Sequence, residues 1–188
     1  MGLTVISSAA IAGAKDLQAI SSKLTYHDRL QGRFTQTKEL SFLSTPFISA
    51  GSFTLSTAQG LDWLVETPLQ SRMIVKESVI TLDGKPVKDR GVGQFMATIM
   101  QAFMTGDLQG VRKDFTVAGE LSDDGSWRLT LRPKTLVLRT VLSHIDLAGD
   151  TFLQRIAIVE LDETRTIIEF NKVVGTPLES QDGNAPGA

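Results

Sequence analysis

Apolar residues recur along this chain with two different periods, and the change of period divides it into segments. Leu17, Ile20 and Leu24 have helical spacing and predict a short amphipathic helix over residues 15–25, followed by a polar turn at residues 26–29. From Leu30 onward apolar and polar residues alternate, which is typical of β-strands with one buried face. The alternation predicts strands over residues 32–40, 51–55, 61–66 and 72–75, and a second block over residues 115–121, 127–133, 142–149, 152–161 and 165–172. Proline, glycine and aspartate residues between the strands predict tight turns and an antiparallel meander.

Between the two strand blocks lies a second helical segment, residues 92–105, whose surface is apolar except for one narrow stripe. Gln94, Thr98, Gln101 and Thr105 form that stripe at helical spacing. Three of the five methionines lie on the remaining surface, and thioether side chains adapt to irregular apolar shapes. Such a helix must bury most of its surface, either as an ordinary core helix on the sheet or as a lid that faces a ligand.

The composition limits the function classes. The 188 residues are 41% hydrophobic and 21% charged, which indicates a folded globular protein rather than a disordered chain. A net charge of −2 provides no overall field that would hold nucleic acid. The sequence holds no cysteine and two widely separated histidines, so thiol chemistry is excluded and neither a metal site nor a cofactor is expected.

The two ends of the chain differ from its middle. Residues 2–14 carry no charge and end in small residues that fit the A-x-A cleavage pattern of a signal peptide. We interpret residues 1–14 as a signal-peptide remnant; the alternative is an apolar helix that packs on the domain. Residues 15–174 are expected to form one domain, and residues 175–188, which contain two prolines and three glycines, a flexible tail.

Six short motifs resemble those of the outer-membrane lipoprotein carriers of the LolA type. Their order and separations carry the resemblance, which covers residues 15–174. The motifs are Phe34-x-Gln36-x-Lys38, Gly51-x-Phe53, Leu61-x-Trp63, Thr67-Pro68, the apolar helix at residues 92–105, and Leu131-x-Pro133-Lys134.

The resemblance implies an α+β fold: an open antiparallel β-barrel of about 11 strands with an N-terminal helix and a helical lid over an apolar cavity. It implies a periplasmic, non-enzymatic carrier that takes acylated lipoprotein, or a related acylated lipid, from an inner-membrane donor to an outer-membrane acceptor, and that acts as a monomer. The expected ligand-binding residues are apolar and lie on the concave face of the sheet or on the lid: Phe34, Phe53, Leu55, Leu61, Trp63, Met73, Val75, Phe95, Met96, Ile99, Met100 and Phe103.

The sequence leaves two other function classes open. A VioE-type enzyme is thought to share this fold, and His144 and Asp146, two positions apart on a predicted strand, would share a face. A solvated strand face accounts for the same pair without catalysis, and His27 is expected to be exposed in its polar turn. A periplasmic adaptor that binds through a sheet edge is the other class. Thr57 stands where the lipoprotein carriers place an arginine that holds the lid shut, so another acylated cargo is plausible.

Overall fold

The structure, a computed structural model, describes residues 17–24, 26–77, 79–87 and 91–177. These residues form one 11-stranded sheet, in which every neighbouring pair of strands is antiparallel. The strands are β1 (His27–Glu39), β2 (Phe47–Ser56), β3 (Gly60–Thr67), β4 (Ser71–Lys76), β5 (Val79–Leu82), β6 (Lys85–Pro86), β7 (Phe115–Leu121), β8 (Trp127–Pro133), β9 (Leu142–Gly149), β10 (Leu153–Glu160) and β11 (Arg165–Pro177).

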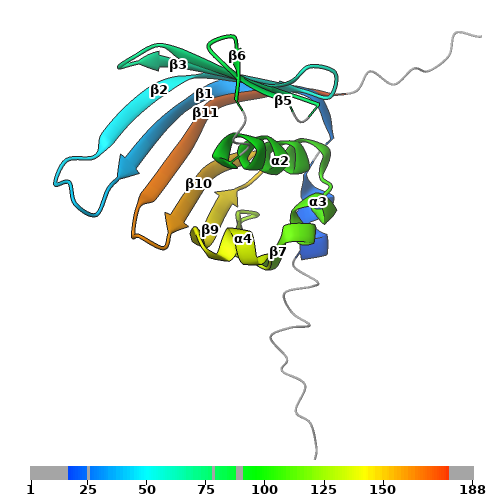
Figure 1. Ribbon diagram of the computed structural model, residues 1–188. Helices are drawn as coiled ribbons and strands as arrows, with labels where there is room; N and C mark the ends of the chain where they lie inside the picture. The colour runs from blue at the N-terminus through cyan, green and yellow to red at the C-terminus, as the bar shows by residue number, and fades with distance from the viewer. Residues whose placement is uncertain (1–16, 25, 78, 88–90, 178–188) are drawn as a thin grey trace, which may run out of the picture.

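The sheet is a meander that is interrupted once, at its centre. Its order is β6-β5-β4-β3-β2-β1-β11-β10-β9-β8-β7, so the first strand pairs with the last. The two edges, β6 and β7, are not paired with each other among the described residues, and the sheet curves strongly (Figure 1). This confirms the α+β fold and the open antiparallel barrel that the family resemblance implies.

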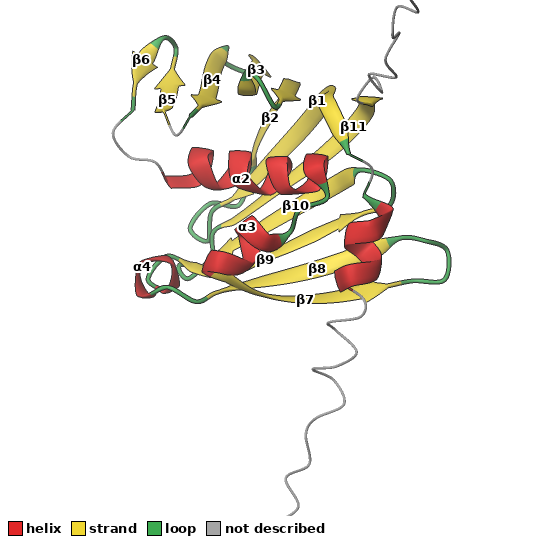
Figure 2. Ribbon diagram, turned by 90° about the vertical axis from the view of Figure 1, so that its right-hand side faces the viewer, coloured by secondary structure: helices red, strands yellow, loops and turns green. Residues whose placement is uncertain are grey.

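Helices occupy the concave side of the sheet (Figure 2). Helix α2 (Gly91–Thr105) crosses this side and is followed by α3 (Gln109–Asp114), whereas α4 (Leu136–Arg139) connects β8 to β9. Residues 17–23 are also helical, and their side chains Leu17 and Ile20 lie against Gly119 of β7. The Ser21 hydroxyl donates a hydrogen bond to the carbonyl oxygen of Gly106 at 2.5 Å, which ties the first helix to the end of α2.

Residues of three sequence motifs meet in an aromatic cluster on the concave face. The ring of Phe34 on β1 stacks on that of Trp63 on β3, with centroids 3.7 Å apart. Phe53 of β2 lies 6.2 Å from Trp63, and Phe170 of β11 meets Phe53 edge-on at 5.3 Å. Stacked and edge-on arrangements are the favourable ones for aromatic pairs. The motifs therefore mark positions where β1, β2 and β3 pack closely on one another.

Three strands and the apolar helix lie where the sequence predicted them. The strands at residues 115–121, 127–133 and 142–149 have the predicted bounds, and α2 begins one residue earlier than expected. The sequence did not predict β5, β6, α3 or α4. The elements β5, β6 and α4 have four residues or fewer, and the six residues of α3 are less than two helical turns, so a period hardly repeats in any of them.

Three predicted boundaries are wrong, and the first is the start of β2, at Phe47 instead of residue 51. Strand β1 begins at His27, so residues 27–29 are not a polar turn, and β11 continues to Pro177, so residues 175–177 do not belong to a tail. The pairing of β1 with β11 shifts register between His27 and Arg29 and again between Gln31 and Arg33. A bulge breaks the alternation of buried and exposed residues on which the prediction depended. Residues 1–14 and 178–188 lie outside the described residues.

Candidate functional site

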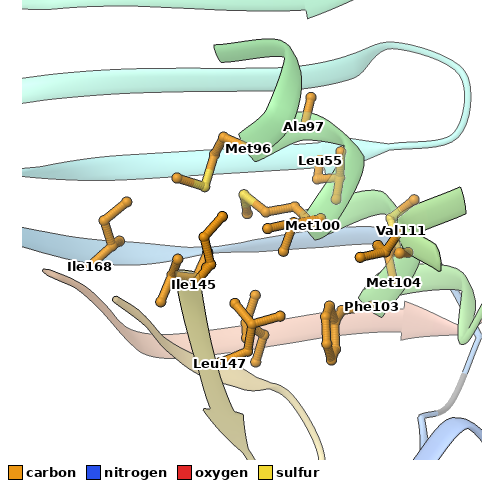
Figure 3. Close-up of a cluster of buried hydrophobic side chains, with 14 of the residues drawn as sticks. Leu55, Met96, Ala97, Met100, Phe103, Met104, Val111, Ile145, Leu147 and Ile168 are labelled. Atoms are coloured by element: carbon orange, nitrogen blue, oxygen red, sulfur yellow. The ribbon is translucent and has the colours of Figure 1, made fainter. Parts of the chain in front are cut away.

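The candidate site is the interior between the concave face of the sheet and helix α2. Met96, Met100 and Phe103 extend from α2 toward the sheet, where Ile145 and Leu147 of β9 lie opposite (Figure 3). All five side chains are buried. The interior is therefore apolar on both sides.

The structure brings most of the expected ligand-binding residues together, on the concave face of the sheet and on the helix that covers it. Met73 is half-buried beside the core, and the side chain of Phe95 lies outside the described part of the structure. The others are buried members of a single apolar cluster: Phe34, Phe53, Leu55, Leu61, Trp63, Val75, Met96, Ile99, Met100 and Phe103. Their placement agrees with the sequence analysis, and their binding of a ligand stays a prediction.

The polar stripe of α2 faces away from the interior. Gln101 is exposed, and Thr98 and Thr105 are half-buried, whereas the side chain of Gln94 lies outside the described part of the structure. The Thr105 hydroxyl donates to the carbonyl oxygen of Gln101 at 3.0 Å. Two adjacent residues of this helix therefore differ in burial: Met100 is buried and Gln101 is exposed.

An aromatic pair fixes the C-terminal half of α2 on the sheet. The ring of Phe103 stacks on that of Trp127 from β8, with centroids 5.0 Å apart and planes inclined by 16°. The indole Nε1 of Trp127 donates a hydrogen bond to the carbonyl oxygen of Asp150 at 2.6 Å. Trp127 is thus held by its own polar atom, and it supports the helix through its ring.

The interior retains little free space. A cavity of about 20 Å³, here called the interior cavity, is lined on one side by Met100 and Phe103 of α2. This volume holds about one water molecule. An acyl chain must therefore displace side chains to enter. The remaining walls are Leu30, Phe53, Phe152, Leu153, Phe170 and Val173.

An open groove lies next to the interior cavity and shares part of its wall. Phe152, Phe170 and Val173 line both spaces. The outer groove has a volume of about 500 Å³, which falls within the range of small-ligand pockets. Its other residues are Ala148, Gln154, Arg155, Glu169, Asn171 and Lys172.

The sequence analysis missed most residues that line the interior cavity. Phe170 follows Ile168 at the spacing of two that identified the lining of the first block, so the same rule would have found it. Phe152 is the first residue of the predicted strand 152–161, but Gln154, two positions later, is polar, so the spacing of two gives no signal there. Val173 lies within the bulge of β11, between Asn171 and Val174, where the alternation does not report the buried face.

His27 is buried, contrary to the sequence expectation. Its side chain is 7% exposed, and neither ring nitrogen has a hydrogen-bond partner among the described residues. The imidazole lies 5.3 Å from the ring of Phe152, measured between centroids. Burial lowers the pKa of His27 below its ordinary value, because the charged form would lose its hydration.

His144 and Asp146 share a face of β9, as predicted, but that face is the outer one. His144 Nε2 lies 3.5 Å from Asp146 Oδ2, and the intervening Ile145 points into the core. Asp146 Oδ1 accepts a hydrogen bond from the Thr130 hydroxyl of β8 at 2.8 Å. The pair is therefore separated by the sheet from the interior where a cargo would lie.

Thr57, which the resemblance places where the lipoprotein carriers have a latch arginine, forms a hydrogen bond with β1 through its hydroxyl. This residue lies in the turn between β2 and β3, and its Oγ1 donates to Asp28 Oδ1 at 3.0 Å. The bond is exposed, so its contribution to stability is small. The alignment of Thr57 with the latch arginine stays a prediction.

Exposed apolar side chains gather at one end of the barrel, here called the apolar rim. This end carries the β1–β2, β3–β4 and β10–β11 turns together with α4, and the first and last of these turns point to the left in Figure 1. Pairing of Glu39 with Arg165 and of Ala50 with Thr67 brings these turns to the same end. The residues of the rim are Phe42, Leu43, Phe47, Ile48, Leu69, Leu136, Val137, Val141 and Leu161.

Comparison with known proteins identifies one matching family. The model of the family described as outer membrane lipoprotein carrier protein LolA matches residues 26–181. No curated protein matches the sequence. None of the helices that the structure describes combines the length and apolar character needed to cross a membrane.

Several solved structures are similar at low identity. A LolA superfamily protein from Nitrosomonas europaea, NE2245, is 8% identical over 90% of this chain and 96% of its own, with a TM-score of 0.49. A chain of the MucA/MucB complex of Pseudomonas aeruginosa is 10% identical over 90% of this chain and 60% of its own, with a TM-score of 0.43. A DUF1329 family protein from Desulfovibrio piger is 9% identical over 93% and 96%, with a TM-score of 0.37.

Proposed function

The chain belongs to the outer membrane lipoprotein carrier (LolA) family, and from this premise we propose that it carries acylated lipoprotein, or a related acylated lipid, through the periplasm. The acyl chains bind between the concave face of the sheet and α2. The protein takes its cargo from an inner-membrane donor and passes it to an outer-membrane acceptor, without acting as an enzyme. The observation that carries the proposal is the family match over residues 26–181.

The chemistry of the interior supports the binding of acyl chains. Each methylene removed from water contributes roughly 0.8 kcal/mol, so an acyl chain gains most in a space that is apolar on all sides. The aromatic cluster of the sheet and the buried face of α2 provide apolar walls of this kind, and their side chains fill most of the volume between them. Met96, Met100 and Met104 are buried on that face, and flexible thioether side chains can rearrange around a guest with little strain.

The apolar rim supports the transfer step. Phe42 is 78% exposed, Leu69 is 80% exposed and Leu136 is 79% exposed, and these side chains come from three different connections at one end of the barrel. Groups of exposed large apolar side chains mark surfaces that contact a partner or a membrane. A carrier needs such a surface at each membrane it visits.

Two adjacent residues of α2 provide a matched test of the interior site. Met100→Glu places a carboxylate in the wall of the interior cavity, whereas Gln101→Glu places the same group on the exposed stripe. A buried, unpaired charge is costly, so Met100→Glu should abolish binding of the fluorescent acyl probe cis-parinaric acid. Gln101→Glu should bind the probe as the wild type does. Circular dichroism verifies that both variants are folded.

A third variant keeps the test informative if Met100→Glu does not fold. Met100→Ala removes apolar volume from the cavity wall without adding charge, and the enlarged cavity should bind the probe more tightly than the wild type. Equal binding by the wild type and both Met100 variants would reject the interior as the site. A wild type that binds no acyl probe would reject the carrier function and leave the adaptor as the better explanation.

A further inference from the structure

Strand β11 separates from β10 partway along the sheet. The ladder between them ends at the pair Arg155 and Glu169, although β10 begins earlier, at Leu153, and β11 continues to Pro177. Beyond this point β11 stays paired with β1 alone. Lys172 marks the separation with a left-handed backbone, φ 52°, a conformation that is uncommon for a residue with a side chain. The result is a slit between residues 152–154 and residues 170–173.

The slit lies between the interior cavity and the outer groove. Phe152, Phe170 and Val173 form the wall that both spaces share, so these three side chains are the barrier between inside and outside. Phe152 is half-buried and comes from the turn before β10 rather than from a hydrogen-bonded strand. Of the three, it is the side chain least constrained by the sheet.

The two sides of the slit have opposite chemistry. The interior side is lined by aliphatic, aromatic and methionine side chains only. The outer side carries Arg155 and Lys172 against one carboxylate, Glu169, and none of the three forms an ion pair with any residue that the structure describes. The groove therefore has a net positive charge beside an apolar opening. An amphiphile with an acyl chain and an anionic head matches both sides at once.

We propose that this slit is the entry site for an acyl lipid with an anionic head group. The acyl chain passes between Phe152 and Phe170 into the interior, and the head stays in the outer groove near Arg155 and Lys172. This inference rests on the proposed function and deepens it, because it assigns a route and a class of cargo. A carrier with a side entrance can load its chain without releasing α2 from Trp127.

The route is tested by blocking the slit, since the chain has no native cysteine to interfere with labelling. Asn171→Cys provides an exposed thiol in the outer groove, and a bulky maleimide attached there covers the slit. The control is Arg132→Cys with the same label, on the exposed face of β8. Stopped-flow fluorescence of cis-parinaric acid should show an association rate about tenfold lower for the labelled Asn171→Cys protein alone, because blocked access acts on the rate of binding.

The head-group preference is tested by comparing cis-parinaric acid with its methyl ester. In the double variant Arg155→Gln and Lys172→Gln, affinity for the acid should fall about fivefold, in line with two exposed charge interactions. Affinity for the uncharged ester should not change. The control is the double variant Arg128→Gln and Arg132→Gln, which removes the same charge from β8 and should affect neither probe. The advantage of the acid should shrink at high salt.

The outcomes separate this inference from the proposed function. If the wild type binds neither probe, the proposed function fails and this inference fails with it. If the wild type binds but labelled Asn171→Cys associates at the unlabelled rate, the slit is not the entry and the carrier function stands. If the double variant Arg155→Gln and Lys172→Gln loses affinity for the acid and the ester equally, or for neither of them, the proposed preference for an anionic head group is wrong.

Discussion

Replacing Phe103 with alanine distinguishes a ligand-binding interior from an ordinary core. This ring is 5% exposed, stacks on Trp127 at 5.0 Å and lines the interior cavity. Removing a buried phenylalanine side chain costs about 3–5 kcal/mol of the free energy of unfolding, through lost burial and the cavity that remains. For a chain of this size, that loss lowers Tm by about 10 °C.

The new space adjoins a cavity of about 20 Å³, so an acyl chain can occupy it and recover part of the lost stability. At a palmitate concentration about 100 times the Kd of the Phe103→Ala variant, binding should raise the free energy of unfolding of this variant by about 2.7 kcal/mol. The same palmitate concentration should stabilise the wild type less, because the interior of the wild type is almost filled. Urea unfolding followed by circular dichroism, with and without palmitate, measures both quantities.

The matched control is Phe115→Ala on β7. Phe115 is 2% exposed, so its replacement should cost a similar free energy, but it does not line the interior cavity. Palmitate should therefore stabilise Phe115→Ala no more than it stabilises the wild type. If palmitate restores both variants equally, or fails to restore Phe103→Ala, the enlarged interior does not accept an acyl chain and the reasoning is refuted.

Three further predictions concern the groups around the interior. Burial lowers the pKa of His27 below 6.5, so near and below that pH the unfolded chain binds more protons than the native one. The free energy of unfolding should therefore decrease as the pH is lowered from about 7.5 to about 5. Urea titrations should show a smaller decrease for His27→Phe. Gly175→Ala places a Cβ atom against the ring of His27 and should lower the free energy of unfolding by about 1–3 kcal/mol. Part of this loss should disappear in the double variant with His27→Ala, as thermal melts of the wild type, the two single variants and the double variant would measure. Trp127→Phe removes the donor to the Asp150 carbonyl and should cost about 1–3 kcal/mol in urea unfolding; a change below the error of the measurement would show that water replaces the bond.

Much of this fold could be predicted from local periodicity. The alternation in residues 115–121 and 127–133 reports strands that have one face against the core, and each strand has seven residues, enough for the pattern to repeat. The apolar surface of α2 likewise follows from its sequence, as the exposure of Gln101 shows. The spacing of Phe34, Phe53 and Trp63 indicated one face, and the rings do meet there.

Other features depend on long-range pairing, which local periodicity does not record. The pairing of β1 with β11 joins the two halves of the sheet through residues more than a hundred positions apart, such as Phe34 and Phe170. The register of this pairing shifts next to His27, and His27 is buried there. The sequence pattern had predicted a polar turn at this residue. Phe152 lines both the interior cavity and the outer groove only because β10 and β11 diverge beside it.

The central claim, that acyl chains bind between the sheet and α2, is tested most directly by photo-crosslinking. A palmitic acid with a photoreactive group at the end of its chain, illuminated with the wild-type protein and mapped by peptide mass spectrometry, reports the residues that surround the chain. The account predicts labelled peptides that contain Met100 or Phe103 of α2 together with Phe53 of β2 or Phe170 of β11, because these side chains surround the interior cavity. Labels confined to the apolar rim, at residues such as Phe42 or Leu136, would contradict the claim and place the lipid on the outside of the barrel.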